Sequence, residues 1–420
     1  MHKREFLKKA ATFSLTMPFA WESFARSFEE ASSLGSTQLA SEDAFWENIR
    51  DSYLLTPEYI NLESGYYCML PEPLLEKYIS HVHRVNREHS HFMRTSLNKE
   101  KKQIIDRLAI EAGCSPDELA ITRNTTESLD LVINGIHWKK GDEAIMALQD
   151  YGAMLNMFRL MQERHGINLR KVSLPNDPKN DEEIVELYRS QITEKTKLLM
   201  VCHMVNITGQ VLPVRKICDM AHSLGVQVMV DGAHSFAHIP TSMRELDCDY
   251  YGTSLHKWLS APLGNGLLYV KKERIPELWP LLAEDKKEPG DIKRLSHTGT
   301  TPVHTILGIA DAIDHYHVVG PERKTERLLY LQKYWSDKVR QIPKVILNTP
   351  EDPDRSCAIA NVGIRGIAPK QMAKRLMDEF NIWTVGIDRP GVQGCRITPN
   401  VYTTTNELDQ LVEAINTLSS

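Results

Sequence analysis

Two short segments decide how the chain is expected to fold: Val230-Asp231-Gly232-Ala233-His234 and, further on, Thr253-Ser254-Leu255-His256-Lys257-Trp258. The first ends an apolar run and the second ends a short predicted strand, so each marks the point where a strand gives way to polar residues. An Asp-Gly pair alone is usually only a turn. The order and spacing of the two segments therefore carry more information than either segment by itself.

A carboxylate followed by a lysine in this arrangement is what a pyridoxal phosphate enzyme requires. The amine of Lys257 would form a Schiff base with the cofactor, and the carboxylate of Asp231 would keep the pyridine nitrogen protonated so that the ring accepts electrons. Ser254 and His256 flank the lysine and can reach the cofactor phosphate. The two segments thus predict pyridoxal 5'-phosphate as the cofactor.

Five other segments contain side chains of the kinds that bind anions, aromatic rings and carboxylates. They are Thr122-Arg123-Asn124-Thr125-Thr126-Glu127, Asp150-Tyr151-Gly152-Ala153, Val205-Asn206-Ile207-Thr208-Gly209, Thr298-Gly299-Thr300-Thr301-Pro302-Val303-His304 and Cys395-Arg396-Ile397-Thr398-Pro399-Asn400-Val401-Tyr402. The first lies at a predicted strand-to-helix junction, where backbone amides, hydroxyl groups and the helix N-terminus favour an anion. The fourth, taken by itself, would be a plain turn.

In this order the segments resemble the motifs of the class-V aminotransferases, a family of fold-type-I pyridoxal phosphate enzymes. Cysteine desulfurases, kynureninase-like proteins and isopenicillin N epimerase-like proteins belong to the same group. The resemblance runs from about Tyr59 to the C-terminus. It implies an α/β fold of the fold-type-I pyridoxal phosphate transferases, with a mainly parallel sheet between helices in a large domain and a smaller α+β C-terminal domain.

The resemblance implies how the first segments would bind the cofactor. Thr125 and Thr126 would bind its phosphate, with Asn124 in place of the usual glycine because asparagine can adopt a positive φ. Tyr151 would stack on the pyridine ring where the desulfurase branch has a histidine. Because tyrosine is a much poorer acid-base group near neutral pH, its part in catalysis would differ from that of the histidine.

The remaining segments would complete the site. Asn206 is expected beside the phenolic oxygen of the cofactor and the substrate, and His234 would stand at the same oxygen, where many relatives have glutamine. Thr300 would reach the phosphate bound by the neighbouring subunit, which implies at least a homodimer. Arg396 would hold the α-carboxylate of the substrate in a two-pronged contact that lysine cannot supply.

The resemblance implies an amino acid substrate whose Cα proton is removed by Lys257. Return of the proton to a cofactor carbon gives transamination, return to the other face of Cα gives epimerisation, and loss of a β-substituent gives a lyase. An aminotransferase or an isopenicillin N epimerase-like epimerase is favoured, and the use of an α-keto acid acceptor stays open.

Cysteine desulfurase or C–S lyase is the alternative. Desulfuration needs a cysteine on a mobile loop before the arginine, whereas residues 384–394 contain none and Cys395 adjoins Arg396. A degenerate, non-catalytic binding protein is disfavoured because both Lys257 and Asp231 are present.

Composition excludes several other classes of function. With 420 residues, 42% of them hydrophobic, the chain is large enough for two domains. A net charge of −5 without a basic stripe gives no sign of a nucleic-acid partner, and no run of 18 apolar residues predicts a membrane span. The seven cysteines lack metal-binding spacing, and the histidine cluster is joined by no cysteine or carboxylate at ligand spacing, so no metal site is predicted. That cluster consists of His81, His83, His89 and His91.

The first residues differ from the rest of the chain. His2-Lys3-Arg4-Glu5-Phe6-Leu7-Lys8 resembles a twin-arginine export signal with lysine in the first arginine position, and Ser23-Phe24-Ala25 fits a small-x-small cleavage site. The uncharged stretch between them is weakly apolar, so a basic amphipathic helix without an address is the alternative. We expect a periplasmic or exported protein if the signal works and a cytoplasmic one otherwise.

The predicted elements alternate. Strands are expected at residues 119–122, 143–148, 197–204 and 226–230, and helices at residues 125–136, 153–165 and 214–224. This alternation is typical of parallel α/β layers. Beyond Gly320 the prediction is a charged helix at residues 322–341, strands at residues 358–363 and 395–398, and helices at residues 369–380 and 405–419. We therefore divide the chain into a signal segment (residues 1–25), an N-terminal segment (residues 26–60), a large cofactor-binding domain (residues 61–320) and a small domain (residues 321–420).

Overall fold

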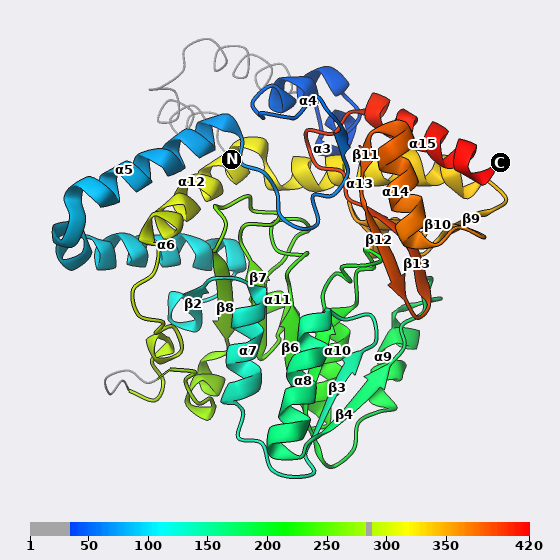
Figure 1. Ribbon diagram of the computed structural model, residues 1–420. Helices are drawn as coiled ribbons and strands as arrows, with labels where there is room; N and C mark the ends of the chain where they lie inside the picture. The colour runs from blue at the N-terminus through cyan, green and yellow to red at the C-terminus, as the bar shows by residue number, and fades with distance from the viewer. Residues whose placement is uncertain (1–33, 283–287) are drawn as a thin grey trace.

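The structure is a computed structural model that describes residues 34–282 and 288–420. The predicted export signal at residues 1–25 lies outside the described residues. A seven-stranded sheet and a four-stranded sheet form the centres of two layered regions, with the C-terminus beside the smaller sheet (Figure 1). Among the described helices, none is both long and apolar enough to cross a membrane.

The large sheet is parallel except for one strand. Its strands, in spatial order, are β2 (Leu119–Thr122), β8 (Gly266–Val270), β7 (Tyr250–Ser254), β6 (Gln227–Asp231), β5 (Thr196–Cys202), β3 (Glu143–Ala147) and β4 (Asn168–Val172). Only β8 runs antiparallel to its neighbours β2 and β7. The parallel strands β5, β6 and β7 therefore end side by side at the same edge of the sheet.

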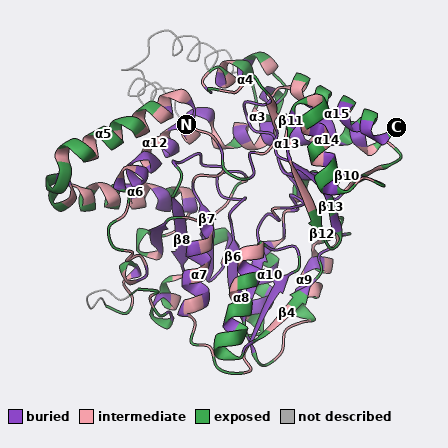
Figure 2. Ribbon diagram, viewed as in Figure 1, coloured by how far each residue is buried: buried purple, intermediate pink, exposed green. Residues whose placement is uncertain are grey.

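Helices cover both faces of this sheet because its strands are apolar on both sides, as is typical of parallel sheets. Leu199 and Val201 of β5 pack into the hydrophobic core of one face, whereas Leu198 and Met200 pack into the core of the other. The first core is closed by α6 (Leu97–Ala112), α9 (Asp181–Arg189), α10 (Val214–Ser223) and α12 (Val303–Val319). The second is closed by α7 (Thr125–Gly135) and α8 (Gly152–His165). The strands form the buried middle layer in Figure 2.

Two long helices extend the first face. Helix α5 (Glu72–Thr95) packs along α12 and α6, and its outer surface is exposed over much of its length (Figure 2). The short helix α11 (Met243–Leu246) packs against α10.

The smaller sheet has the order β12 (Val385–Arg389), β13 (Val392–Ile397), β10 (Ala360–Ile364) and β9 (Val345–Leu347), and all its pairings are antiparallel. Helices α13 (Pro321–Arg340), α14 (Pro369–Phe380) and α15 (Thr405–Ser419) enclose its hydrophobic core. The N-terminal part joins this region, because β1 (Ile60–Asn61) pairs in parallel with β11 (Ile382–Trp383). Helices α3 (Ser36–Leu39) and α4 (Asp43–Arg50) precede β1.

The predicted α/β fold with a mainly parallel sheet is confirmed by the strand pairings. Three elements agree residue for residue, namely β2, α14 and α15. Before β2, Ser115 caps a short 3-10 turn in a capping box with Glu118. Strands β4 and β8 were not predicted. The first alternates polar and apolar residues at a partly exposed edge, and the direction of the second depends on pairing with distant strands.

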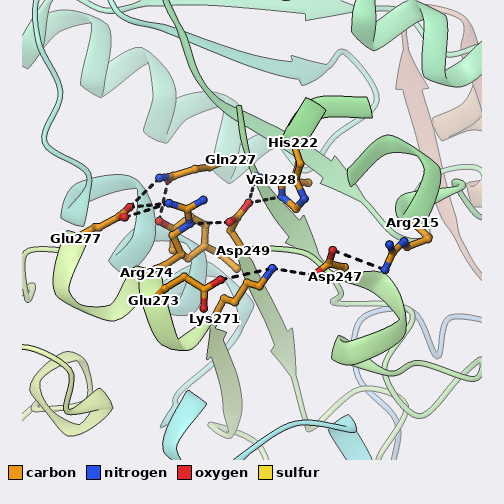
Figure 3. A network of polar contacts seen from close by, with 11 residues as sticks. Arg215, His222, Gln227, Val228, Asp247, Asp249, Lys271, Glu273, Arg274 and Glu277 are labelled. Atoms are coloured by element: carbon orange, nitrogen blue, oxygen red, sulfur yellow. Dashed lines mark hydrogen bonds and ion pairs between the residues drawn. The ribbon is translucent and has the colours of Figure 1, made fainter. Parts of the chain in front are cut away.

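At the end of the sheet where β7 begins, a buried carboxylate connects neighbouring elements through hydrogen bonds (Figure 3). Asp249, which immediately precedes β7, is only 1% exposed. Its carboxylate accepts hydrogen bonds from the Val228 N–H at 2.7 Å, from Arg274 Nε at 2.8 Å and from His222 Nε2 at 2.8 Å. Burial by itself would raise the pKa of Asp249, but these three donors outweigh burial and hold the pKa below its usual value.

We expect Asp249→Ala to lower the free energy of unfolding by about 3–5 kcal/mol, because it removes the buried carboxylate that accepts hydrogen bonds from His222, Arg274 and the Val228 N–H. In the unmodified protein this stabilisation is present above the unfolded pKa of about 4 and is lost as the pH falls through the lower folded pKa. Urea unfolding between pH 3 and pH 7 measures both effects. Asp219→Ala, which removes a half-exposed partner of Arg215, is the control and should change stability by less than about 0.5 kcal/mol. Equal losses for the two variants would contradict the structural role of Asp249.

Candidate active site

The predicted site residues come together where parallel strands end. Asp231 is the last residue of β6, and it pairs with Cys202 of β5 and with Gly252 of β7. Lys257 follows the end of β7, and Asn206 follows the end of β5. Ligands of open α/β sheets bind beyond the carboxyl ends of the strands, so this edge is the expected place for a cofactor.

Lys257 and Asp231 are close enough for their charges to affect each other. Burial lowers the pKa of Lys257 to about 8, and the nearby carboxylate of Asp231 opposes this shift. Asp231 is 4% exposed, and one of its carboxylate oxygens accepts a hydrogen bond from the Ala233 N–H at 3.0 Å. Burial raises the pKa of Asp231, partly offset by that N–H and by Lys257. The lysine amine thus loses its proton at a lower pH than an exposed lysine does.

The first turn of α7 lies directly against the end of β7. The Thr125 N–H donates to Ser254 Oγ at 2.9 Å, and the two hydroxyl groups lie 2.7 Å apart. Thr126 is the next residue of the same turn and is partly exposed. The structure therefore brings three predicted phosphate ligands, Thr125, Thr126 and Ser254, to one helix N-terminus, a position that favours anions.

Asn124 plays a different part from the one expected. Its φ is −172°, which is extended backbone, so the positive φ predicted for it is wrong. Its side-chain oxygen instead accepts a hydrogen bond from the Glu127 N–H at 2.9 Å and caps α7. A helix cap explains why asparagine suits this position without a left-handed backbone.

His256 follows the end of β7, two residues after Ser254. Its Nδ1 donates to the Asn265 carbonyl at 3.0 Å, because a carbonyl can only accept. Burial lowers the pKa of His256 to about 4, so the ring is neutral in the structure described here and Nε2 is its unprotonated nitrogen. An anion at Nε2 would favour protonation of that nitrogen.

Tyr151 precedes α8 and follows the end of β3, and 49% of its surface is exposed. A ring that is open to this degree is available for stacking on a bound aromatic group. Asp150, the residue before it, is 5% exposed and accepts a hydrogen bond from the Ala147 N–H at 2.7 Å.

Arg396 lies on β13 of the smaller sheet and reaches towards the large one. Its Nη1 donates to the carbonyl oxygen of Asn206 at 3.1 Å. Its Nε donates to Glu63 Oε2 at 3.2 Å, and Nη2 forms an ion pair with the other oxygen of Glu63. The Nε and Nη2 atoms of Arg396, which together suit a carboxylate, are therefore already bound by the carboxylate of Glu63.

Glu63 is a site residue that sequence reasoning missed. Its backbone forms a bridge to Thr398, and the following Gly65 N–H donates to Thr398 Oγ1 at 2.9 Å. A Cβ atom on Gly65 would lie 2.9 Å from Arg396 Cζ, so only glycine lets this segment approach the guanidinium so closely. No local signal in the sequence connects Glu63 to Arg396, which is more than 300 positions away.

The side-chain oxygen of Asn206 forms no hydrogen bond with the described part of the chain. This atom, Oδ1, is buried. Because the oxygen and nitrogen of an amide are assigned from their surroundings, the side chain offers either a donor or an acceptor to a bound group. A buried amide without a partner is the property expected of a ligand-binding residue.

Thr300 is exposed and does not lie in the cluster around Lys257. The loop that carries it, between the 3-10 turn Ile292–Leu295 and α12, borders a cavity of about 920 Å³ that is also lined by residues of α6 and β2. The predicted contact of Thr300 with a phosphate in the other subunit stays a prediction.

Comparison with known proteins agrees with this geometry. The family model of the class-V aminotransferases matches residues 71–411. The chain belongs to the class-V aminotransferase family. It is 27% identical over 393 residues to the isopenicillin N epimerase of Streptomyces clavuligerus, covering 90% of this chain and 99% of that protein. It is 25% identical to a cysteine desulfurase of Haloferax volcanii, covering 86% of this chain and 89% of the relative.

Solved structures show the same fold. The apo cysteine desulfurase of Thermococcus onnurineus superposes with a TM-score of 0.78 at 21% identity, covering 89% of this chain and 98% of that one. The cystine C–S lyase C-DES, in complex with cysteine persulfide, gives a TM-score of 0.78 at 20% identity. The two TM-scores, with 98% of each solved chain covered, show that the whole fold-type-I architecture is present.

Class-V enzymes depend on pyridoxal phosphate, and the residues of this site fit that cofactor. Lys257 is the amine that would hold it covalently, and Asp231 is the carboxylate beside it. Thr125, Ser254 and the N-terminus of α7 form an anion cradle at one end of the site. The uncommitted amide of Asn206 follows the end of β5, the strand that pairs with β6 beside Asp231.

Proposed function

We propose that this protein removes the proton from Cα of an α-amino acid and returns it to carbon, as an epimerase or aminotransferase does. Bound pyridoxal phosphate makes the Cα proton of an attached amino acid acidic by delocalising the electrons that the proton leaves behind. The enclosed pair of Lys257 and Asp231, with Arg396 nearby, is the observation that carries this proposal.

Lys257 is the proposed proton carrier. Its pKa of about 8 places the neutral amine within reach of physiological pH, which a general base requires. Asp231 supplies a negative charge at the adjacent strand end, where it would hold a proton on a ring nitrogen. Both groups are displaced from bulk water, so their charges act strongly on whatever lies between them.

Arg396 is the proposed site of the substrate α-carboxylate. A planar guanidinium binds a carboxylate through two parallel hydrogen bonds. Glu63 already makes this kind of contact, so an incoming carboxylate has to take its place. The backbone around Glu63 is tied to Thr398, and the exchange would therefore be a rotation of the Glu63 side chain and not a movement of the segment.

The state of the cysteines favours carbon-centred proton transfer over desulfuration. Cys395, next to Arg396, is fully buried, its thiol donates to the Pro369 carbonyl, and burial raises its pKa to about 12. The thiol pKa values of the other six cysteines are raised as well, with burial as the main cause. A desulfurase needs a reactive thiolate, and thiols in apolar surroundings are inert.

The proposal is tested with a panel of L- and D-amino acids in deuterated water. We expect deuterium at Cα of the true substrate, together with either the opposite enantiomer or a keto acid, and neither product in Lys257→Ala. Mass spectrometry and chiral chromatography measure these products, and circular dichroism checks that the variant is folded. Release of sulfide or persulfide from cysteine without deuterium exchange of any other amino acid would overturn the proposal in favour of C–S cleavage.

We expect Glu63→Gln to lower KM for the amino acid substrate by about tenfold, because the substrate carboxylate no longer competes with a charged group for Arg396. The effect on kcat should be small, since Glu63 would have left Arg396 before the proton moves. Steady-state kinetics separates the two constants. Glu58→Gln removes the same charge from an exposed position of the same segment and should leave both constants unchanged. A higher KM in Glu63→Gln would mean that Glu63 only orients Arg396.

We also propose a homodimer in which Thr300 donates to the phosphate at the neighbouring subunit. Thr300→Val should weaken cofactor binding by about 1–3 kcal/mol, the range for a lost hydrogen bond to a charged group. The control is Thr301→Val, one position along the same loop, which should bind the cofactor normally. Cofactor titration measures affinity and sedimentation velocity measures the oligomer. A monomeric, cofactor-loaded protein would refute this assignment.

A further inference from the structure

Trp258, the residue after Lys257, makes a directional contact with His234. Its side chain is fully buried, and its indole Nε1 lies 3.3 Å from His234 Nδ1. An indole N–H is a donor and cannot accept, so His234 Nδ1 must be the acceptor. His234 is neutral, because burial and the positive charges of Lys257 and Arg396 all lower its pKa. The single ring proton of His234 is therefore on Nε2.

The other nitrogen of the same ring faces the reactive amine. His234 Nε2 lies 3.0 Å from Lys257 Nζ. With the proton on Nε2, His234 donates and the lysine nitrogen accepts through its lone pair. Only a neutral lysine nitrogen has such a lone pair, so this contact disfavours the ammonium form. It acts in the same direction as burial, which lowers the pKa of Lys257.

Trp258 is itself held in one orientation. The ring of His238 stacks on it with a centroid distance of 3.7 Å and an interplanar angle of 28°. His238 Nδ1 donates to the His234 carbonyl at 2.8 Å, and its Nε2 accepts from the Ala358 N–H at 3.1 Å. Both partners of His238 are backbone groups of fixed polarity, so its own tautomer is also determined. The indole thus has little freedom to turn away from His234.

We propose that Trp258 is a positioning residue that sets the tautomer of His234, so that His234 always presents an N–H donor to the nitrogen of Lys257. This inference rests on Lys257 as the reactive amine of the proposed function. It adds Trp258, a fully buried residue that acts through His234. Without the indole N–H, His234 can carry its proton on Nδ1, and its Nε2 then becomes an acceptor that stabilises a charged lysine.

The ring nitrogens of His234 provide the direct test. In cofactor-loaded protein labelled with ¹⁵N in histidine, we expect the His234 signal to show a protonated Nε2 and an unprotonated Nδ1. Comparison with His234→Gln identifies the signal. In Trp258→Phe we expect the Nδ1-protonated form to appear. A wild-type signal with the proton on Nδ1, or on both nitrogens at neutral pH, would overturn the proposal without any variant having to fold.

The second measurement is the pH titration of the bound cofactor by absorbance. Trp258→Phe should move the midpoint upwards by about one pH unit, the shift expected when a donor to the neutral nitrogen becomes an acceptor for the charged one. Trp335→Phe is the matched control, because Trp335 is equally buried in the core of the smaller sheet and its indole has no hydrogen-bond partner among the described residues. Its midpoint should not change.

A double variant separates positioning from packing. The side-chain amide of glutamine can donate to the nitrogen of Lys257 with either tryptophan or phenylalanine at position 258. Trp258→Phe should therefore not shift the midpoint further in a His234→Gln background. An equal shift in both backgrounds would show that Trp258 acts through packing alone, which overturns the proposal. Failure of the proposed proton transfer has a different signature, since the ring tautomer and the absorbance midpoint are measured without any substrate.

Discussion

The enclosure of an amine and a carboxylate at the ends of adjacent parallel strands is the constraint on which the rest of this structure depends. Asp231 ends β6 and Lys257 follows β7, so both charges meet where the sheet stops and water is scarce. Burying such groups is costly unless they are paired or hydrogen-bonded. The surroundings accordingly supply an N–H to Asp231 and a histidine nitrogen to Lys257.

At the opposite end of β7, the strand is held in place by Asp249, so the end near Lys257 does not have to serve this purpose. Asp249 connects the start of β7 to α10, to β6 and to the segment after β8, through one hydrogen bond each from His222, Val228 and Arg274. The strands are therefore anchored at one end by satisfied buried charges, and the other end is left for functional groups. Because Asp249 stabilises the sheet at this end, the residues around Lys257 at the other end do not have to stabilise it.

The region around the smaller sheet supplies side chains and hydrogen bonds to the site. It carries Arg396, and Ala358, just before its strand β10, orients the ring of His238 that stacks on Trp258. Lys324, at the start of α13, is buried and donates to the Trp258 carbonyl, which holds the segment after Lys257 from the same side. The two layered regions are thus joined by polar contacts that end at the reactive lysine, and the chemistry depends on both.

Local sequence predicted many of the strands and helices and the residues that stand at their ends, but not β4 or β8. Lys257, Asp231, Thr125 and Ser254 could be predicted because each directly follows or opens an element with a clear apolar period. Tertiary structure decided what depends on contacts between distant segments: the antiparallel direction of β8, the occupation of Arg396 by Glu63, and the proton position that Trp258 imposes on His234. Asn124 shows the same limit at short range, since its residue type fits both a left-handed turn and a helix cap, and only the packed helix selects the cap. Periodicity reports which face of an element is buried, whereas the partner that a buried polar group meets is set by the whole fold.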